Sequence, residues 1–296
     1  MMNVYWLEQS ETDVPAHDDW LGPRETVRLG TMRLAKRRAD WRPGRWTAKG
    51  ALASQLHLMF ETEVFARLEI LAGESGAPEV FVDGHASDLT TSLSHRAGRA
   101  LCAVSSPSGA LGCDLELVVP RSSAFVADYF STEEQALVAR ACSPDRAALI
   151  VLVWSAKESA LKALRTGLRL DTRSVIVHLD ATSLGDGANL PGEDSTVAFR
   201  QFEGRKWHPL SVGAENGERF QGHWQRAGNF LRTIVAARHY RSLSDPNTRS
   251  PSLVAASDGM RRPVPGDQIG SQVTGFRALS RKLANPIHFP GLPTIR

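Results

Sequence analysis

The sequence GCDLE at residues 112–116 is the stretch from which the fold and chemistry of this chain are deduced. Its flanks are apolar, and we predict a strand. Residues two apart on a strand point to the same face, so Asp114 and Glu116 would present both carboxylates on one side while Cys113 and Leu115 face the core. Adjacent carboxylates repel each other unless a cation lies between them. Such oxygen ligands suit Mg²⁺, and two solvated acids on an exposed strand are the alternative.

A second acidic element is WSAKESALK at residues 154–162. On a helix, Glu158 and Lys162 are four residues apart and share one face. Residues 147–154 are nearly all apolar, so we predict a buried helix in which Glu158 needs a strong partner. A metal ion, with Lys157 and Lys162 on phosphate groups, would supply one. The alternative is an exposed Glu158–Lys162 ion pair, which would contribute only about 0.3–0.5 kcal/mol.

A third polar element is TSLSHR at residues 91–96. Ser, His and Arg side chains at the end of a strand can donate several hydrogen bonds to a phosphate. A Ser-His pair also occurs in hydrolases. However, Ser94 and His95 are neighbours on opposite faces of a strand, which is poor geometry for a nucleophile and its base. No GxSxG motif accompanies them, so we favour anion binding.

Positive charge is concentrated near the N-terminus. The net charge of the chain is only +3, but eight Lys and Arg residues lie between residues 28 and 49, where Asp40 is the only acid. This concentration predicts an anionic partner. A solvated helix face is one alternative. Nucleic-acid binding is another, because Trp41 and Trp46 could stack on bases, although it leaves the carboxylates unexplained.

The composition is that of a globular protein. The chain has 296 residues, enough for one large domain or two small ones, and 42% of them are hydrophobic. Its three cysteines fit no metal-binding or redox motif, which favours free thiols in a reducing compartment. We see no signal peptide and no apolar run of about 20 residues, and therefore expect a soluble, cytoplasmic protein.

Local signals predict alternating strands and helices. A helix is expected from residue 23 to about residue 38, and a second from about 45 to 58, separated by Pro43 and Gly44. Ser131 and Glu134 form a capping-box pattern within a helical region. The sequence shows no obvious repeat, and its last part is rich in Ser, Pro, Gly and Arg. Strands are expected at residues 64–71, 80–82, 92–95, 100–105, 111–117, 174–179, 196–202, 210–212 and 230–237, with a hairpin turn at 106–109.

Together the three polar elements resemble the 4'-phosphopantetheinyl transferase superfamily in its monomeric, surfactin-type branch. GCDLE resembles the signature G-x-D-x-E, WSAKESALK resembles W-x-x-K-E-x-x-x-K, and SLSHR resembles the Ser-His motif that meets coenzyme A. The resemblance implies an α/β (α+β) fold of two similar, pseudo-symmetric halves with the active site in the cleft between them. The expected divisions are residues 1–108 (coenzyme A 3'-phosphate grip), 109–241 (Mg²⁺ binding and catalysis) and a disordered tail at 242–296.

The resemblance also implies roles for individual residues. Mg²⁺ would be held by Asp114, Glu116 and Glu158. The catalytic residues would be Glu134, Glu158 and Lys162, with Glu134 preferred over Glu133 as the general base. Coenzyme A would be bound by Arg38, Arg45, Lys49, Ser94, His95, Lys157 and Lys162.

The implied activity is transfer of the 4'-phosphopantetheine group of coenzyme A to a serine of an apo acyl or peptidyl carrier protein, giving the holo carrier and 3',5'-ADP. Mg²⁺ would be the cofactor, and the enzyme would act as a monomer without nucleic acid or membrane. A relative that binds coenzyme A or a carrier without turnover, or a metal-dependent phosphohydrolase, is the alternative. The family often shows a glycine-rich turn after the last lysine, whereas residues 163–167 retain one glycine.

Overall fold

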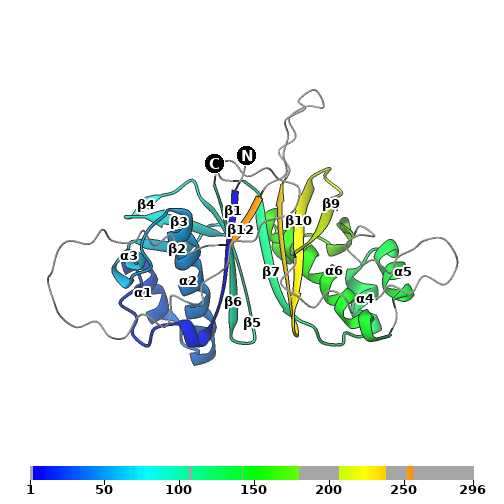
Figure 1. Ribbon diagram of the computed structural model, residues 1–296, viewed down its shortest axis with the longest axis horizontal. Coiled ribbons are helices and arrows are strands. Elements are labelled where there is room, and N and C mark those ends of the chain that lie inside the picture. The colour runs from blue at the N-terminus through cyan, green and yellow to red at the C-terminus, as the bar shows by residue number, and fades with distance from the viewer. Residues whose placement is uncertain (1–2, 107–108, 142, 180–206, 238–251, 256–296) are drawn as a thin grey trace, which may run out of the picture.

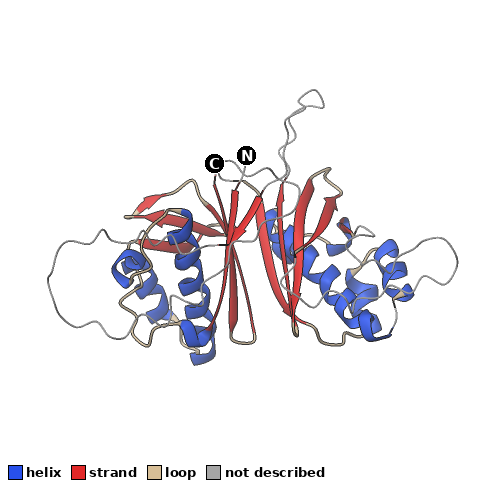
Figure 2. Ribbon diagram, viewed as in Figure 1, coloured by secondary structure: helices blue, strands red, loops and turns tan. Residues whose placement is uncertain are grey.

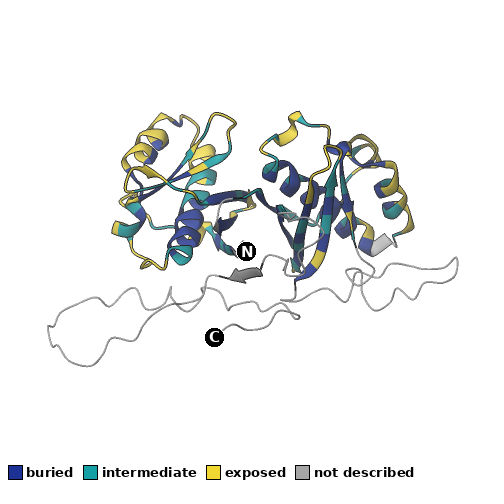
Figure 3. Cartoon of the chain, turned by 90° about the horizontal axis from the view of Figure 1, so that it is seen from above, coloured by how far each residue is buried: buried dark blue, intermediate teal, exposed yellow. Residues whose placement is uncertain are grey.

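Two sheets meet at the centre of the molecule, and helices cover their outer faces (Figure 1 and Figure 2). The computed structural model describes residues 3–106, 109–141, 143–179, 207–237 and 252–255. We call residues 3–106 the N-terminal half and residues 109–237 the C-terminal half. Exposed residues gather on the outer helices and loops of both halves, whereas the central strands are mostly buried (Figure 3). The mixture of helices and strands confirms the predicted α/β class.

The sheet of the N-terminal half has the strand order β12-β1-β6-β5. β1 (Asn3–Ser10) pairs antiparallel with β6 (Arg99–Ser106), which pairs antiparallel with β5 (Thr90–Arg96). β12 (Ser252–Ala255), within the predicted tail, pairs in parallel with β1. The rest of that predicted tail lies outside the described residues. A second sheet joins β2 (Leu68–Ala72), β3 (Pro78–Val82) and β4 (His85–Ala86).

Helix α2 (Ala35–Gln55) packs against β6 and β1, and its second half is almost wholly buried. Alanines in this second half let the helix lie close to the sheet, and aromatic residues fill the space around it. The remaining helices of this half are η1 (Glu11–Asp13), α1 (Pro23–Thr31) and α3 (Thr62–Ala66). One hydrophobic core therefore serves α2 and both sheets of the N-terminal half.

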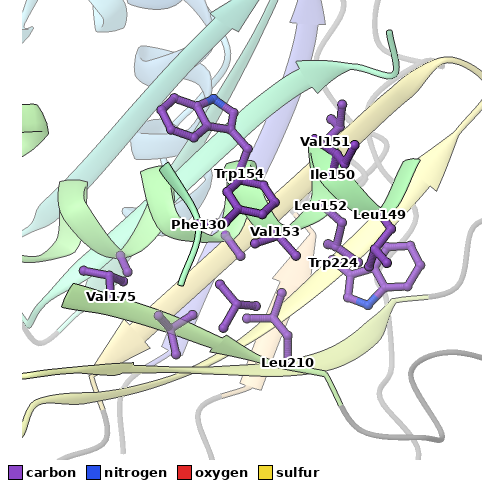
Figure 4. Packing of buried hydrophobic residues seen from close by; sticks show 14 of the residues in the cluster. Phe130, Leu149, Ile150, Val151, Leu152, Val153, Trp154, Val175, Leu210 and Trp224 are labelled. Atoms are coloured by element: carbon purple, nitrogen blue, oxygen red, sulfur yellow. The ribbon is translucent and has the colours of Figure 1, made fainter. Parts of the chain in front are cut away.

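The sheet of the C-terminal half has the order β7-β11-β10-β9-β8, with every adjacent pair antiparallel. Helix α6 (Ser143–Ala163) packs on β7 and β11, and its apolar side chains meet Phe130, Leu210 and Trp224 in the core (Figure 4). The strands are β7 (Leu111–Leu117), β8 (Val175–His178), β9 (His208–Ala214), β10 (Arg219–Ala227) and β11 (Phe230–Ala237). The other helices are α4 (Ser123–Tyr129), α5 (Thr132–Arg140), η2 (Gly167–Arg169) and η3 (Thr172–Ser174).

The predicted hairpin at residues 106–109 is wrong. β6 pairs with β1 and β5, whereas β7 pairs with β11, so the chain passes from one sheet to the other between them. The hairpin lies earlier, between β5 and β6, where Ala97 and Gly98 both have positive φ. Two successive residues in this region form the turn that matches the twist of paired strands.

The predicted helix break at Pro43 and Gly44 is also wrong, because both residues lie inside α2. The helix instead starts afresh at Ala35, after α1 ends at Thr31. Burial of the segment that follows Pro43 outweighs the hydrogen bond that proline cannot make. The strand predicted at 64–71 begins later, because its first residues belong to α3 and β2 starts at Leu68. The strand predicted at 196–202 lies outside the described residues.

Among the described residues, none of the helices is both long and apolar enough to cross a bilayer. Cys102 and Cys113 are buried free thiols, as expected, while Cys142 lies outside the described residues.

Candidate active site

The acidic strand β7 lies in the middle of the molecule, where it faces β5 of the other half. Its side chains alternate as predicted: Cys113 and Leu115 enter the hydrophobic core, and Asp114 and Glu116 point to the opposite face. The carboxylate of Asp114 is buried, and that of Glu116 is partly exposed. The strand therefore carries both acids to the junction of the two halves.

Gly112 explains how β7 comes so close to α6. A β-carbon at this position would lie 1.7 Å from the carbonyl oxygen of Ser159 on α6, so only glycine fits. Hydroxyl groups fasten the same helix to the sheet, since Ser155 and Ser159 lie 2.9 and 2.7 Å from the hydroxyl of Thr233 on β11. Small residues at this contact bring the polar side chains of α6 beside those of β7.

Lys162 links the helix and the strand. Its Nζ donates to Asp114 Oδ1 at 2.8 Å and to the Cys113 carbonyl at 3.0 Å, and it lies 4.0 Å from Glu158 Oε2. Burial lowers the pKa of Lys162, but the combined effects of Asp114, Cys113 and Glu158 outweigh burial and raise the pKa overall. The ammonium group is therefore positive and joins the two acidic elements that the sequence predicted to converge.

Ser94 completes this cluster from the N-terminal half. Its hydroxyl donates to Asp114 Oδ1 at 2.8 Å, and the neighbouring Ser92 Oγ accepts from the Cys113 amide at 3.0 Å. Ser94 thus contacts an acid of the site, a contact that the predicted coenzyme A role does not include. His95 is exposed and follows Ser94 on β5, so its side chain points to the other face.

Glu116 lies near two arginines, of which Arg96 belongs to the polar element predicted at residues 91–96 and Arg121 was not predicted. Arg96 Nε and Arg121 Nη2 are 3.4 and 3.5 Å from Glu116 Oε2. Burial and the charge of Asp114 nevertheless raise the pKa of Glu116. The same two causes raise the pKa of Glu158, whose side chain is 24% exposed. The negative charges of the carboxylates therefore add to burial in disfavouring one another's ionised form.

The chemistry of these donors fits a hard divalent cation. Asp114 Oδ2 and Glu116 Oε2 are buried and have no hydrogen-bond partner. Carboxylate oxygens that repel one another are the ligands that Mg²⁺ takes in proteins. As they stand, however, no three His, Cys, Asp or Glu side chains within the described ranges are grouped so that they could hold a metal ion. The metal assignment for Asp114, Glu116 and Glu158 thus stays a prediction.

A pocket of about 370 Å³ opens beside this cluster, between the two halves. The N-terminal half contributes Arg45, the β2–β3 loop around Ser75 and one side of β5. The C-terminal half contributes Lys162 and Arg165. Three cations line the pocket, and none of its described lining residues is acidic, so the pocket suits an anion. Arg45 and Lys162 were predicted from the sequence to bind coenzyme A, whereas no motif marks Arg165 or the β2–β3 loop.

Arg45 is the one residue of the predicted 3'-phosphate grip that lines the pocket. Its guanidinium lies 4.9 Å from the centre of the Trp41 ring and 3.9 Å from Glu25 Oε1, and the buried Nε has no hydrogen-bond partner. Arg38 is exposed on α2, and the pocket lining does not include it.

Lys49 was expected to bind coenzyme A, but its ammonium group is fully buried. Its Nζ forms an ion pair with Glu25 at 2.5 Å and donates to the carbonyls of Trp20 and Phe65. All three ammonium protons therefore have partners inside the protein, and the structure gives Lys49 a structural role in place of phosphate binding.

Lys157 and Glu134 are a second such pair. Lys157 is fully buried, lies 2.7 Å from Glu134 Oε2 and donates to the carbonyls of Thr172 and Val175. Glu134 is 2% exposed, and its carboxylate also accepts from the amides of Ser131 and Val177. These contacts confirm the predicted capping box. Because these contacts occupy the ammonium group of Lys157 and the carboxylate of Glu134, they argue against the expected binding of coenzyme A by Lys157. They also argue against Glu134 as the general base. Glu133 beside it is exposed.

Comparison with known proteins gives a match that lies in the C-terminal half. No curated protein matches the chain. Residues 110–212, which include β7 and α6, match the family model described as 4'-phosphopantetheinyl transferase superfamily. The matched range contains both acidic elements of the site, while the surfactin-type branch stays a prediction. Over this part of its sequence, the chain is similar to the 4'-phosphopantetheinyl transferase superfamily.

Proposed function

We propose that this protein transfers the 4'-phosphopantetheine group of coenzyme A to a serine of an apo carrier protein, releasing 3',5'-ADP. The superfamily supports phosphopantetheine transfer in general, and this proposal specifies donor, acceptor and products. The observation that carries it is the double contact of Lys162, which lines the cationic pocket and also binds Asp114. A diphosphate held in the pocket would therefore lie next to the carboxylates.

Asp114, Glu116 and Glu158 would hold Mg²⁺, which would neutralise the charge of the diphosphate during transfer. Ser94 fixes the orientation of Asp114 through its hydroxyl group. Lys162 of the C-terminal half and Arg45 of the N-terminal half would bind phosphate oxygens in the pocket that both residues line. Positioning and charge stabilisation of this kind account for most of the catalysis in phosphoryl transfer.

In the reaction, the serine oxygen of the carrier attacks the β-phosphorus, the bond from that phosphorus to the bridging oxygen breaks, and 3',5'-ADP leaves with the electron pair. The serine proton needs an acceptor near the cleft. Among the residues predicted to be catalytic, Glu158 is placed best for this task, because its side chain is partly exposed and a carboxylate has a second oxygen besides the one that would hold Mg²⁺. Glu134 belongs to the frame that supports α6.

The pocket and carboxylates come from one chain, so a single copy supplies every residue that the proposal uses. We propose that the enzyme acts as a monomer. Its buried free thiols suit the reducing cytoplasm, where we propose that it works.

The test is incubation of the full chain with apo acyl and peptidyl carrier proteins, coenzyme A and Mg²⁺, followed by intact-mass analysis of the carriers. We expect the wild-type chain to add one phosphopantetheine group. Glu158→Ala should lower the rate at least about 100-fold, because it removes a charged group that acts on the transferring phosphate. Glu215→Ala, which removes an exposed carboxylate between β9 and β10, serves as the control.

Binding of coenzyme A without modification of any carrier would replace the proposal with a non-catalytic binding protein. Activity of Glu158→Ala near that of Glu215→Ala would remove Glu158 from the site. Circular dichroism of both variants separates loss of chemistry from loss of fold.

A further inference from the structure

The turn that follows helix α6 has an unusual residue, Arg165, at a position that glycine normally occupies. The Thr166 amide donates to the Leu161 carbonyl at 3.2 Å, and the Arg165 amide donates to the Lys162 carbonyl at 3.0 Å. These two bonds define a Schellman motif, in which Arg165 occupies the residue after the cap. Its φ is 57°, in the left-handed region that glycine normally occupies. The backbone of Arg165 is therefore strained, and a glycine here would relieve the strain.

No protein contact explains why an arginine occupies this position. Within the described residues, the Arg165 side chain forms no hydrogen bond or ion pair, and it is exposed. It lines the pocket between the two halves. The other two cations of the pocket have partners, since Lys162 binds Asp114 and Arg45 lies near Glu25 and Trp41. Arg165 is thus the pocket's cation without an anionic protein partner in the described chain.

We infer that Arg165 is a phosphate-binding residue of this pocket, and that its strained position is retained because the guanidinium contributes directly to ligand affinity. A guanidinium can form two parallel hydrogen bonds to a phosphate, and a single good charge-assisted contact changes affinity considerably. The choice of coenzyme A as the test ligand rests on the proposed function, whereas the inference itself concerns phosphate binding at Arg165.

The molecule contains a matched control at the end of α2. The Leu58 amide donates to the Ala53 carbonyl and the His57 amide to the Ser54 carbonyl, so α2 ends in the same motif with His57 in place of Arg165. His57 has a φ of 56° and is also exposed. It is absent from the pocket lining. His57→Gly and Arg165→Gly therefore relieve the same strain, but only the second removes a cation from the pocket.

The experiment measures thermal stability and ligand affinity of the full chain with His57→Gly, Arg165→Gly and Arg165→Gln. Both glycine variants should raise Tm by roughly 2–4 °C. Arg165→Gly should weaken coenzyme A binding about tenfold or more in calorimetry, while His57→Gly leaves it unchanged. Arg165→Gln keeps the β-carbon and the strain, so affinity should fall without a gain in Tm.

Dephospho-coenzyme A and 3',5'-ADP identify the phosphate group concerned. A loss confined to ligands with a 3'-phosphate assigns Arg165 to that group, and an equal loss for dephospho-coenzyme A assigns it to the diphosphate. Unchanged affinity in both Arg165 variants would overturn the inference and leave the proposed function standing. Binding without carrier modification would contradict only the proposed function, and a wild-type chain that binds none of the three ligands would contradict both.

Discussion

The two halves of the molecule each bury one lysine–glutamate ion pair, and the two pairs have corresponding partners. Lys49 is the fifteenth residue of α2, and Lys157 is the fifteenth residue of α6, which has the same length. Each ammonium group donates to two backbone carbonyls and to one glutamate, Glu25 or Glu134. Burial lowers the pKa of both lysines, and the neighbouring carboxylate counteracts it.

The glutamates correspond equally closely. Glu25 accepts hydrogen bonds from the amide that precedes its helix, at Gly22, and from a β2 amide. Glu134 accepts from the equivalent amides, at Ser131 and on β8. In each half the carboxylate thus joins a helix start, a strand and a buried lysine. We call this arrangement the internal frame, and it occurs once in each half.

The residue after each lysine is where the halves differ. On α6 it is Glu158, which reaches the carboxylate cluster. On α2 it is Gly50, where a β-carbon would lie only 2.7 Å from side-chain atoms of Leu7 and Phe60. The N-terminal half therefore has no room for an acid at this position. The comparison teaches that the ion pairs belong to the duplicated frame, and that the acidic chemistry belongs to one half alone.

The largest expected effect is loss of either buried pair. Glu25→Gln and Glu134→Gln each leave a lysine buried without its counter-charge, so each should lower the free energy of unfolding by about 3–5 kcal/mol. Urea unfolding of the two variants measures this loss. Similar losses would support the view that the pairs are equivalent parts of the frame.

Turnover separates this view from a catalytic role for Glu134. Under conditions where Glu134→Gln is folded, we expect its carrier modification to stay near the wild-type rate. A variant as stable as wild type but inactive would contradict the view that the two ion pairs have the same structural role. Glu134 would then be the base that the family resemblance implies.

A smaller effect is expected at Glu8, which joins the two halves. This β1 residue accepts from Arg99 of its own half and from Arg232 on β11. Burial raises the pKa of Glu8, but the two arginines outweigh burial and hold the pKa below its ordinary value of 4.5. Glu8→Gln should lower the free energy of unfolding by roughly 2 kcal/mol at neutral pH.

The pH dependence of that difference is a further check. Because folding lowers the pKa of Glu8, its stabilisation is complete well above pH 4.5 and is lost as the pH falls through the folded-state pKa. The free energies of unfolding of wild type and Glu8→Gln should therefore converge below about pH 4. A difference that stays constant between pH 7 and pH 4 would show that the charge of Glu8 is not what joins the halves.

The acidic site could be predicted from the sequence because its charged residues lie within short motifs. Asp114, Glu158 and Lys162 stand at fixed spacings on one strand and one helix, and these periodicities determine which side chains converge. The duplication of the frame is also visible in the sequence as two similar tetrapeptides. WTAK at residues 46–49 and WSAK at residues 154–157 occupy equivalent places on α2 and α6, a match too short to identify as a repeat without the structure.

Other features depend on long-range packing and could not be predicted. Lys49 and Lys157 lie in basic or signature motifs, but whether a lysine faces a ligand or a buried carboxylate depends on the partner helix. The placement of β6 and β7 in separate sheets depends on strands far away in the chain, β1 and β11. Pro43 lies within a helix because later residues of α2 are buried, and local propensity cannot report that burial.

The smallest expected effect concerns the single side-chain hydrogen bond between Ser94 and Asp114, which connects the two halves at the site. Ser94→Ala removes a donor to a buried carboxylate and should lower the free energy of unfolding by about 1.5 kcal/mol in urea unfolding. Because Asp114 keeps Lys162, the fold should persist while the carboxylate loses one of two restraints. The consequence for turnover should then exceed that of Ser54→Ala, which removes a helix serine of the N-terminal half. Among the described residues, the hydroxyl of Ser54 bonds only the Gly50 carbonyl of its own helix. Equal turnover in the two variants would mean that Lys162 alone orients Asp114, and that the N-terminal half contributes to ligand binding without ordering the acidic cluster.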